Sequence, residues 1–462
     1  MNNEYIYDIR NARLAAAGLT VYKSITEDET VRSFVDLLEM IDDESVMPYN
    51  MVNAYHWLVH DLLSIQSGDG VNPWKDHILN LVLNDENAFS KYCQSMEDNA
   101  DIPYAIRQAV KSDMQYLQTL CSIDSDILKQ NIGMRTGMVT QHWPGWDILY
   151  NSGYSRKDER SDQADDSLLW LQNQRISIKR RIADSACWPD MIDALAEFYK
   201  KTGIGIFNKY LTFRWVGSRA GYTGYLTGVA DPDPIRLDNL IGYDVQRKQV
   251  IDNAESFVGG YAANNMLLYG DRGTGKSSTV KALIHRYGKD GLRLIEVSRD
   301  NLNDFYDILD TVRPFKQRFI LFVDDLAFDA DESAYTGLKA VLEGGIEPRP
   351  DNVVIFATSN RRHLVKEYFS DRVGDDELHE GDTKQEKLSL TDRFGIVVTF
   401  LQPDQEEYLE IVDGLARQQG IEMNIDELNS MALQWQAKHN GRSGRTAAQF
   451  ITYLLARTSR PH

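Results

Sequence analysis

Cysteine is scarce in this sequence, and the few cysteines follow no pattern. Three occur in 462 residues, Cys93, Cys121 and Cys187, and none of them forms a CxxC pair. Disulfide-stapled domains and cysteine-bound structural zinc sites both need clustered cysteines. The sequence therefore argues against both classes, and it predicts a reducing cytoplasm as the location.

Long apolar runs are missing as well. No stretch of the sequence approaches the ~18 apolar residues that are needed to span a bilayer. The first 19 residues do not combine a basic segment with a following apolar core, which is the pattern of an export signal. We therefore expect neither a membrane anchor nor an export signal.

Positive charge is in deficit. The 50 lysines and arginines against 69 aspartates and glutamates give a formal net charge of −19. Such a chain repels phosphate backbones and anionic lipid unless cations gather locally. The remaining composition, 42% hydrophobic and 26% charged, is that of a globular protein, and the length predicts two or three domains. The deficit of positive charge slightly favours protein partners over nucleic acid.

The sequence changes character near residue 205. Apolar residues recur at spacings of three and four within residues 31–41, 55–65 and 191–199, which predicts a mostly α-helical N-terminal domain over residues 1–205. Glycines and a DPDP sequence then mark residues 206–234, which we expect to be a connector.

Strand-like apolar runs alternate with amphipathic helical segments after this connector. The alternation predicts an α/β core over residues 235–402, with a parallel five-stranded sheet and helices on both faces. Only helical patterns follow, so residues 403–462 are predicted to form a separate helical segment. The strand-like runs are residues 266–269, 292–297, 319–323, 353–357 and 395–400, and the late helical patterns are residues 405–418, 425–439 and 443–457.

A glycine-rich loop follows the first of these strand-like runs. Residues 270–277 read GDRGTGKS, an intact GxxxxGK[ST] pattern between a predicted strand and a predicted helix. In this pattern backbone N–H groups wrap phosphates, the lysine reaches the outer phosphates, and the hydroxyl ligates magnesium. It predicts a site for ATP and Mg²⁺, against the alternative of a plain turn that caps a helix. The predicted contact residues are Gly270, Asp271, Arg272, Gly273, Thr274, Gly275, Lys276, Ser277 and Ser278, with Ser277 also a metal ligand.

Two aspartates end the strand-like run at residues 319–323. A P-loop site directs a carboxylate at such a strand end to the metal, so Asp324 is the predicted second magnesium ligand, acting through water. The next residue, Asp325, is placed to orient or deprotonate the attacking water. The alternative is that both aspartates simply end the strand.

With these motifs the sequence resembles the AAA+ ATPases. Residues 237–244, LDNLIGYD, stand where that superfamily has the segment that lines the adenine pocket, which implies Leu240, Ile241 and Gly242 as base-contacting residues. Residues 233–445 resemble more narrowly a bacterial family of predicted AAA+ ATPases of undefined function. The resemblance implies that residues 403–462 form a lid. It also implies slow turnover, because glutamate is commoner than aspartate at the position of Asp325.

The resemblance implies two roles at the γ-phosphate within one chain. Residues 354–360, VIFATSN, match the strand that ends in a polar sensor residue, here Asn360. In residues 441–445, GRSGR, the second sensor arginine is Arg445, with Arg442 as the alternative. An asparagine that only forms a turn is the competing interpretation of Asn360.

A third implied role joins two chains. Residues 388–394, LSLTDRF, resemble the segment that carries the arginine finger, so Arg393 would act on the nucleotide of a neighbouring subunit. Arg361 and Arg362 are rival candidates, and a local ion pair with nearby acidic residues is a further alternative for Arg393. A trans arginine would require assembly of a homo-oligomer, either a ring or a filament.

The N-terminal half gives few indications of function. The aromatic cluster at residues 142–146, HWPGW, is more typical of buried packing than of a partner site. The densest positive run, residues 175–181, either forms a solvated helix face or contacts phosphates.

The sequence as a whole predicts a Mg-dependent ATPase that couples turnover in an oligomer to the remodelling of a macromolecular partner. Two alternatives stay open: a slowly hydrolysing nucleotide-dependent switch or scaffold, and a DNA-associated loader or initiator. The residues do not identify the partner, the biological process or the ring size.

Overall fold

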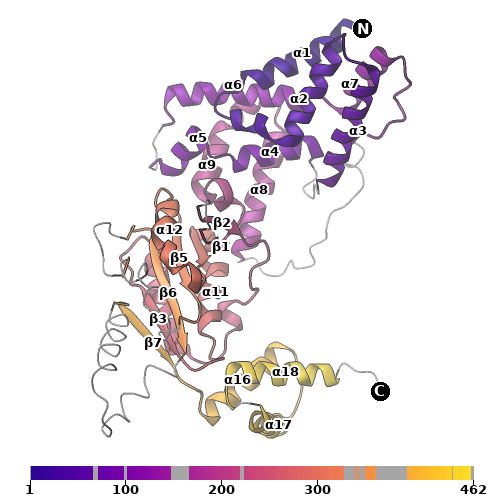
Figure 1. The fold of residues 1–462 in the computed structure, drawn as a ribbon. Helices are drawn as coiled ribbons and strands as arrows, with labels where there is room; N and C mark the ends of the chain where they lie inside the picture. Colours follow the sequence, from indigo (N-terminus) through magenta and orange to yellow (C-terminus); the bar gives the residue numbers. More distant parts are fainter. Residues whose placement is uncertain are drawn as a thin grey trace. The chain divides into compact units, whose positions relative to one another are not determined.

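The computed structural model describes residues 2–65, 71–97, 101–146, 166–218, 223–326, 338, 341–342, 349–360, 393–439 and 441–458. The chain divides into two compact units (Figure 1). The first consists of Met1–Ala164 and Leu169–Lys209, and the second of Asp165–Leu168 and Tyr210–His462. Among the described residues, no helix combines the length and apolarity needed to cross a bilayer.

The first unit is built from α-helices, as predicted. Several of these helices begin where a side chain caps the free N–H groups of the first turn: Asp28 accepts a hydrogen bond from Val31 N, and Asn72 and Asp124 act in the same way. The helices are α1 (Asn2–Gly18), α2 (Glu29–Asp42), α3 (Pro48–Ser64), α4 (Pro73–Asn84), α5 (Ala88–Ser95), α6 (Tyr104–Cys121), α7 (Ser125–Thr136), α8 (Ser167–Ala183) and α9 (Ile192–Thr202). The first two residues of α8 belong to the second unit.

Aromatic side chains fill the core of this unit. Phe34 stacks on Trp74 with ring centroids 4.1 Å apart, and both rings are fully buried. The predicted aromatic cluster is also internal, since Trp143 and Trp146 are buried beside Tyr55. The sequence preference for packing at residues 142–146 is thereby confirmed.

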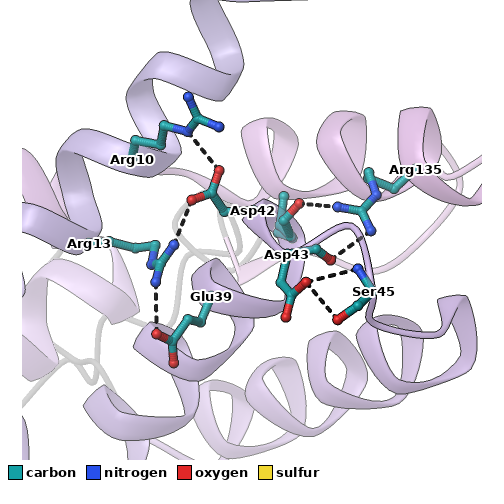
Figure 2. Close-up of polar contacts among 8 residues, drawn as sticks. Arg10, Arg13, Glu39, Asp42, Asp43, Ser45 and Arg135 are labelled. Carbon is teal, nitrogen blue, oxygen red and sulfur yellow. Dashed lines mark hydrogen bonds and ion pairs between the residues drawn. The ribbon is translucent and has the colours of Figure 1, made fainter.

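A chain of ion pairs and hydrogen bonds holds α1 and α7 to the C-terminal end of α2 (Figure 2). Arg10 and Arg13 of α1 both bond the carboxylate of Asp42, at 2.7 and 2.6 Å, and Arg13 also bonds Glu39. Arg135 of α7 donates to two backbone carbonyls at the end of α2. Cations near a helix C-terminus interact favourably with its unpaired carbonyl groups, so these arginines stabilise the end of α2.

The positive run at residues 175–181 is only partly a solvated helix face. Lys179 is buried and forms a 2.6 Å ion pair with Asp76, whose side chain is also buried. Arg175 donates hydrogen bonds to asparagines of α4 and to Asn208. Arg180 and Arg181 are exposed. The helix therefore turns part of the run inward, and the run forms no continuous basic face.

The second unit contains a seven-stranded sheet with the order β2-β1-β4-β5-β6-β3-β7. The five predicted parallel strands are confirmed, and two strands are added at one edge (Figure 1). All neighbours are parallel except β1 and β2. The strands are β1 (Thr212–Val216), β2 (Tyr225–Gly228), β3 (Met266–Gly270), β4 (Leu292–Glu296), β5 (Arg318–Val323), β6 (Val353–Asn360) and β7 (Ile396–Phe400).

Both additional strands lie in the segment that we expected to be a connector. Its glycines serve close packing here: a Cβ at Gly224 would lie 2.2 Å from the Trp215 ring, and one at Gly228 2.0 Å from the Tyr210 ring. In strands, glycine allows such an approach. The glycine-rich composition of this segment indicated a loop, but the segment contains an antiparallel pair of strands.

Helices flank the sheet and follow it. Helices α10 (Asp244–Val258), α11 (Lys276–Tyr287) and α12 (Phe305–Val312) belong to the α/β core. Helices α16 (Gln405–Gln418), α17 (Ile425–Lys438) and α18 (Gly444–Thr458) form the predicted lid. The lid has a core of its own, which includes the buried side chains of Tyr408, Val412 and Phe450.

Candidate nucleotide-binding site

A cavity of about 620 Å³ lies in the second unit, between the phosphate loop and the lid. Its volume is within the range of about 300–1,000 Å³ that is usual for small-molecule sites. Four cationic side chains and two carboxylates line it, so its formal charge is +2 in a chain of −19. The cavity is thus suited to an anion. These side chains are Arg247, Arg272, Lys276, Arg445, Asp324 and Asp325.

The phosphate loop joins β3 to α11 with backbone that requires glycine. Gly270 has φ 142°, and a Cβ there would lie 1.9 Å from the carbonyl oxygen of Phe400 on β7. Gly275 has φ 86° and immediately precedes α11. Because the first N–H groups of a helix are unpaired, this arrangement presents donors to a bound phosphate.

Lys276 is folded back onto the loop. Its side chain is buried, with 6% of the residue exposed, and Nζ donates to the carbonyl oxygens of Gly270 and Asp271 at 3.0 and 2.6 Å. Burial lowers the pKa of Lys276 to about 8, although the nearby carboxylates oppose this shift. A bound phosphate would supply the counter-charge that this ammonium group lacks.

The predicted magnesium ligands lie next to each other. The hydroxyl of Ser277 donates a 2.6 Å hydrogen bond to Oδ1 of Asp324. One hydroxyl and one carboxylate fit Mg²⁺, which binds through one or two protein oxygens together with substrate phosphates and water.

Thr358 on β6 connects the two aspartates, and sequence reasoning missed it. Its hydroxyl donates to Oδ1 of Asp324 at 2.6 Å and accepts a 2.8 Å hydrogen bond from the backbone N–H of Asp325. The side chain is buried. The sequence did contain a signal for Thr358. Residues two apart in a strand share a face, and Thr358 stands two residues before the predicted sensor Asn360.

The sequence-predicted base and sensor meet directly. The side-chain amide of Asn360 donates to Oδ1 of Asp325, while Oδ2 of Asp325 lies 2.9 Å from Nη2 of Arg299. Asp325 also has φ 55°, a left-handed conformation that is uncommon outside glycine. Arg299 follows β4, the strand beside β5, and no motif pointed to it.

Several apolar residues line the cavity as well. Ile241 and Gly242, from the segment expected to contact the base, line it together with Leu240 and with Ile411 and Leu415 of α16. Gly242 has φ 76°, and a Cβ there would lie 3.1 Å from Ile411. Tyr243 donates a 2.7 Å hydrogen bond to the carbonyl of Leu401. Apolar walls of this kind suit a planar heteroaromatic base.

The predicted arginines take different positions. Arg445 lines the cavity, and its backbone N–H donates a 3.1 Å hydrogen bond to the carbonyl of Gly273, which attaches α18 to the phosphate loop. Arg393 precedes β7 and so lies near the N-terminal end of this strand, whereas the phosphate loop follows the C-terminal end of the neighbouring parallel strand β3. Arg393 is not among the described residues that line the cavity. Arg361, Arg362 and the acidic neighbours proposed for Arg393 lie outside the described residues.

Comparisons with known proteins give one family and several structures. The sequence matches the family "Protein of unknown function (DUF815)" over residues 208–458. A search of curated proteins finds no match. A solved structure of the Thermotoga maritima RuvB Holliday junction branch migration motor is 18% identical, with a TM-score of 0.34. The match covers 47% of this chain and 63% of that chain, less than two thirds of its length.

Two variants of the same Thermotoga maritima protein give the same identity and TM-score, with 64% of their chains covered. The family match confirms the predicted resemblance to a family of undefined function. It spans the seven-stranded α/β core, the phosphate loop and the lid. Since more than half of the sequence is matched, the chain belongs to the DUF815 family, and it has the P-loop α/β fold that was predicted for an AAA+ protein.

Proposed function

We propose that this protein is a Mg-dependent ATPase of the AAA+ type. One observation carries the proposal: hydrogen bonds join Ser277, Asp324, Thr358, Asp325 and Asn360 into a single chain beside the phosphate loop. A site for mere phosphate binding needs the loop but has little use for a second carboxylate and an amide beside it. Hydrolysis needs both, to position a water molecule and to accept its proton.

The roles of the residues follow from their chemistry. Loop N–H groups and Lys276 hold the phosphates, and Ser277 and Asp324 hold the magnesium ion, which when bound neutralises charge on the phosphate oxygens. Asp325, oriented by Asn360, takes a proton from the attacking water while the oxygen of that water forms a bond to the γ-phosphorus. The bond from that phosphorus to the β,γ-bridging oxygen breaks, and ADP leaves with the electron pair. Arg445 contacts the γ-phosphate from the lid of the same chain.

We further propose that the protein works as a homo-oligomer. Arg393 lies away from the cavity of its own chain, which supports a role at the nucleotide of a neighbouring subunit. Such an arginine stabilises charge on the transferred phosphoryl group. In this proposal a ring or filament of subunits couples turnover to remodelling of a macromolecular partner in the cytoplasm, and the N-terminal domain recognises that partner.

A nucleotide-dependent switch is the second candidate. Both oxygens of Asp325 are engaged by Arg299 and Asn360, which favours a site that holds ATP with slow hydrolysis. The side chain of aspartate is shorter than that of the commoner glutamate, which also favours slow hydrolysis. The third sequence alternative, a DNA-associated loader, loses support because Lys179 of the positive run is buried in an ion pair.

Phosphate release from Mg-ATP tests the proposal. The wild-type protein should hydrolyse ATP in a magnesium-dependent manner, Lys276→Ala should lose binding and turnover, and Asp325→Asn should bind ATP but not turn it over. Tight binding without turnover in the wild type would favour the switch. A wild type without affinity for ATP would refute both candidates.

A further inference from the structure

Arg272 is a cation in the wall of the cavity, and the sequence motif assigns no task to its side chain. It occupies the third position of the phosphate loop, which the GxxxxGK[ST] pattern leaves free. Its side chain is exposed and lines the cavity. No hydrogen bond or ion pair to its guanidinium is present within the described residues. Arg247, by contrast, is engaged by Asp244 and the carbonyl of Leu240.

The loop places Arg272 at the outer end of the triphosphate site. The lysine of this motif reaches the β- and γ-phosphates. Here Nζ of Lys276 bonds the carbonyls of Gly270 and Asp271, the two residues directly before Arg272. In ATP the β- and γ-phosphates are the two that lie farthest from the base. Arg272 is therefore close to the phosphate that is farthest from the base.

Electrostatics agrees with this placement. The charge of Arg272 acts on the Lys276 ammonium group, as do the opposite charges of three aspartates nearby, so the two cations lie close to each other. An anion bound between two neighbouring cations removes their mutual repulsion. The arrangement thus favours a ligand with high negative charge at this end of the site.

We propose that Arg272 binds the γ-phosphate of ATP from within its own chain and makes the site discriminate ATP from ADP. The inference rests on the proposed function and adds a residue for nucleotide selectivity. A guanidinium offers a planar fork of donors that matches two phosphate oxygens at once. Loss of the γ-phosphate removes the ligand of Arg272 but leaves the loop contacts to the inner phosphates, so ADP would be held without it.

Calorimetric titration of the full-length protein tests this inference. The probes are the slowly hydrolysed analogue AMP-PNP and ADP, each with Mg²⁺, and the variants are Arg272→Ala and the neutral Arg272→Gln. We expect both variants to bind AMP-PNP about tenfold more weakly, as for the loss of one charge-assisted hydrogen bond. Binding of ADP should change by less than about twofold. Arg272→Lys should recover part of the loss, because it restores the charge without the fork.

The matched control is Arg286→Ala, at an exposed arginine in the last turn of α11, far along the helix from the loop. It should leave both affinities unchanged. Equal losses for AMP-PNP and ADP, or no loss for either, would overturn the role of Arg272 while the proposed function stands. A wild type that binds neither nucleotide would overturn both.

Discussion

Oδ2 of Asp325 lies 2.9 Å from Nη2 of Arg299, while the other oxygen accepts a hydrogen bond from Asn360. The proposed catalytic base is thus engaged at both oxygens. To accept a proton from the attacking water, the carboxylate has to exchange one of these two contacts for that water. Arg299 therefore acts as a restraint on hydrolysis in this account.

Removal of that restraint gives the first prediction. Arg299→Ala should raise kcat for ATP, and the size of the effect is bounded by the exposure of the pair, 41% for Arg299 and 52% for Asp325. Exposed pairs contribute about 0.2–1 kcal/mol, so the increase should be at most about fivefold. The control is Arg214→Ala, which removes another exposed arginine–carboxylate pair, with Glu296. A fall in kcat for Arg299→Ala alone would show that Arg299 assists the reaction.

The titration of Lys276 gives the second prediction. Burial lowers its pKa to about 8 in the free protein, and bound phosphates will raise it because they stabilise the ammonium form. Above pH 8 the free lysine loses its proton, so binding must take one up and affinity falls as pH rises. We expect Kd for Mg-AMP-PNP to increase by up to about tenfold per pH unit above pH 8.

Calorimetry at pH 7 and pH 9, in buffers of different ionisation enthalpy, measures both the affinity and the proton uptake. Lys276→Arg is the control, because a guanidinium keeps its proton over this range and its Kd should be flat. Equal Kd values for the wild type at the two pH values would contradict the assignment.

Thr358 gives the third prediction. Thr358→Val keeps the shape of the side chain but removes the hydroxyl that bonds Asp324 and the N–H of Asp325. The unpaired polar groups should cost about 1–3 kcal/mol in the free energy of unfolding, measured with urea. Since loss of a group that orients metal ligands typically costs 10–100-fold, kcat should fall by about that factor. Thr358→Ser, which retains the hydroxyl, should stay close to wild type, and an unchanged kcat for the valine variant would exclude a positioning role.

The buried ion pair of the first unit gives the fourth prediction. Lys179→Met leaves Asp76 charged and buried without its partner, which should lower the free energy of unfolding by about 3–5 kcal/mol. Arg181→Met, at an exposed position of the same helix, should change it by less than about 0.5 kcal/mol. Urea denaturation compares the two, and similar small values would contradict the burial of Lys179. Tests of DNA binding should therefore use Arg180 and Arg181.

The parts of the fold that sequence reasoning predicted are those with a local signal. The run at residues 319–323 became β5 (Arg318–Val323) because a continuous apolar segment of that length is typical of a strand buried on both faces. The phosphate loop was predicted because one spacing specifies a turn, a helix start and a lysine together.

The rest depends on contacts between segments that are distant in the sequence. Arg299 meets Asp325 because β4 and β5 are neighbours in the sheet, and Thr358 meets both aspartates because β6 lies on the other side of β5. Lys179 is buried because Asp76 of α4 faces it, and a charge run by itself does not reveal such a partner. Strands β1 and β2 were missed because this segment contains glycines, which usually mark loops, whereas here Gly224 and Gly228 lie against aromatic rings.

The most direct test of the central claim is ATP turnover across a range of protein concentrations, for the wild type, Lys276→Ala, Arg393→Ala and an equimolar mixture of the two variants. We expect the specific activity of the wild type to rise with concentration and each variant to be inactive. The mixture should recover part of the activity, because intact Arg393 of one subunit meets intact Lys276 of another. The central claim would be contradicted if the wild type released no phosphate at any concentration. It would also be contradicted if the Lys276→Ala variant were as active as the wild type.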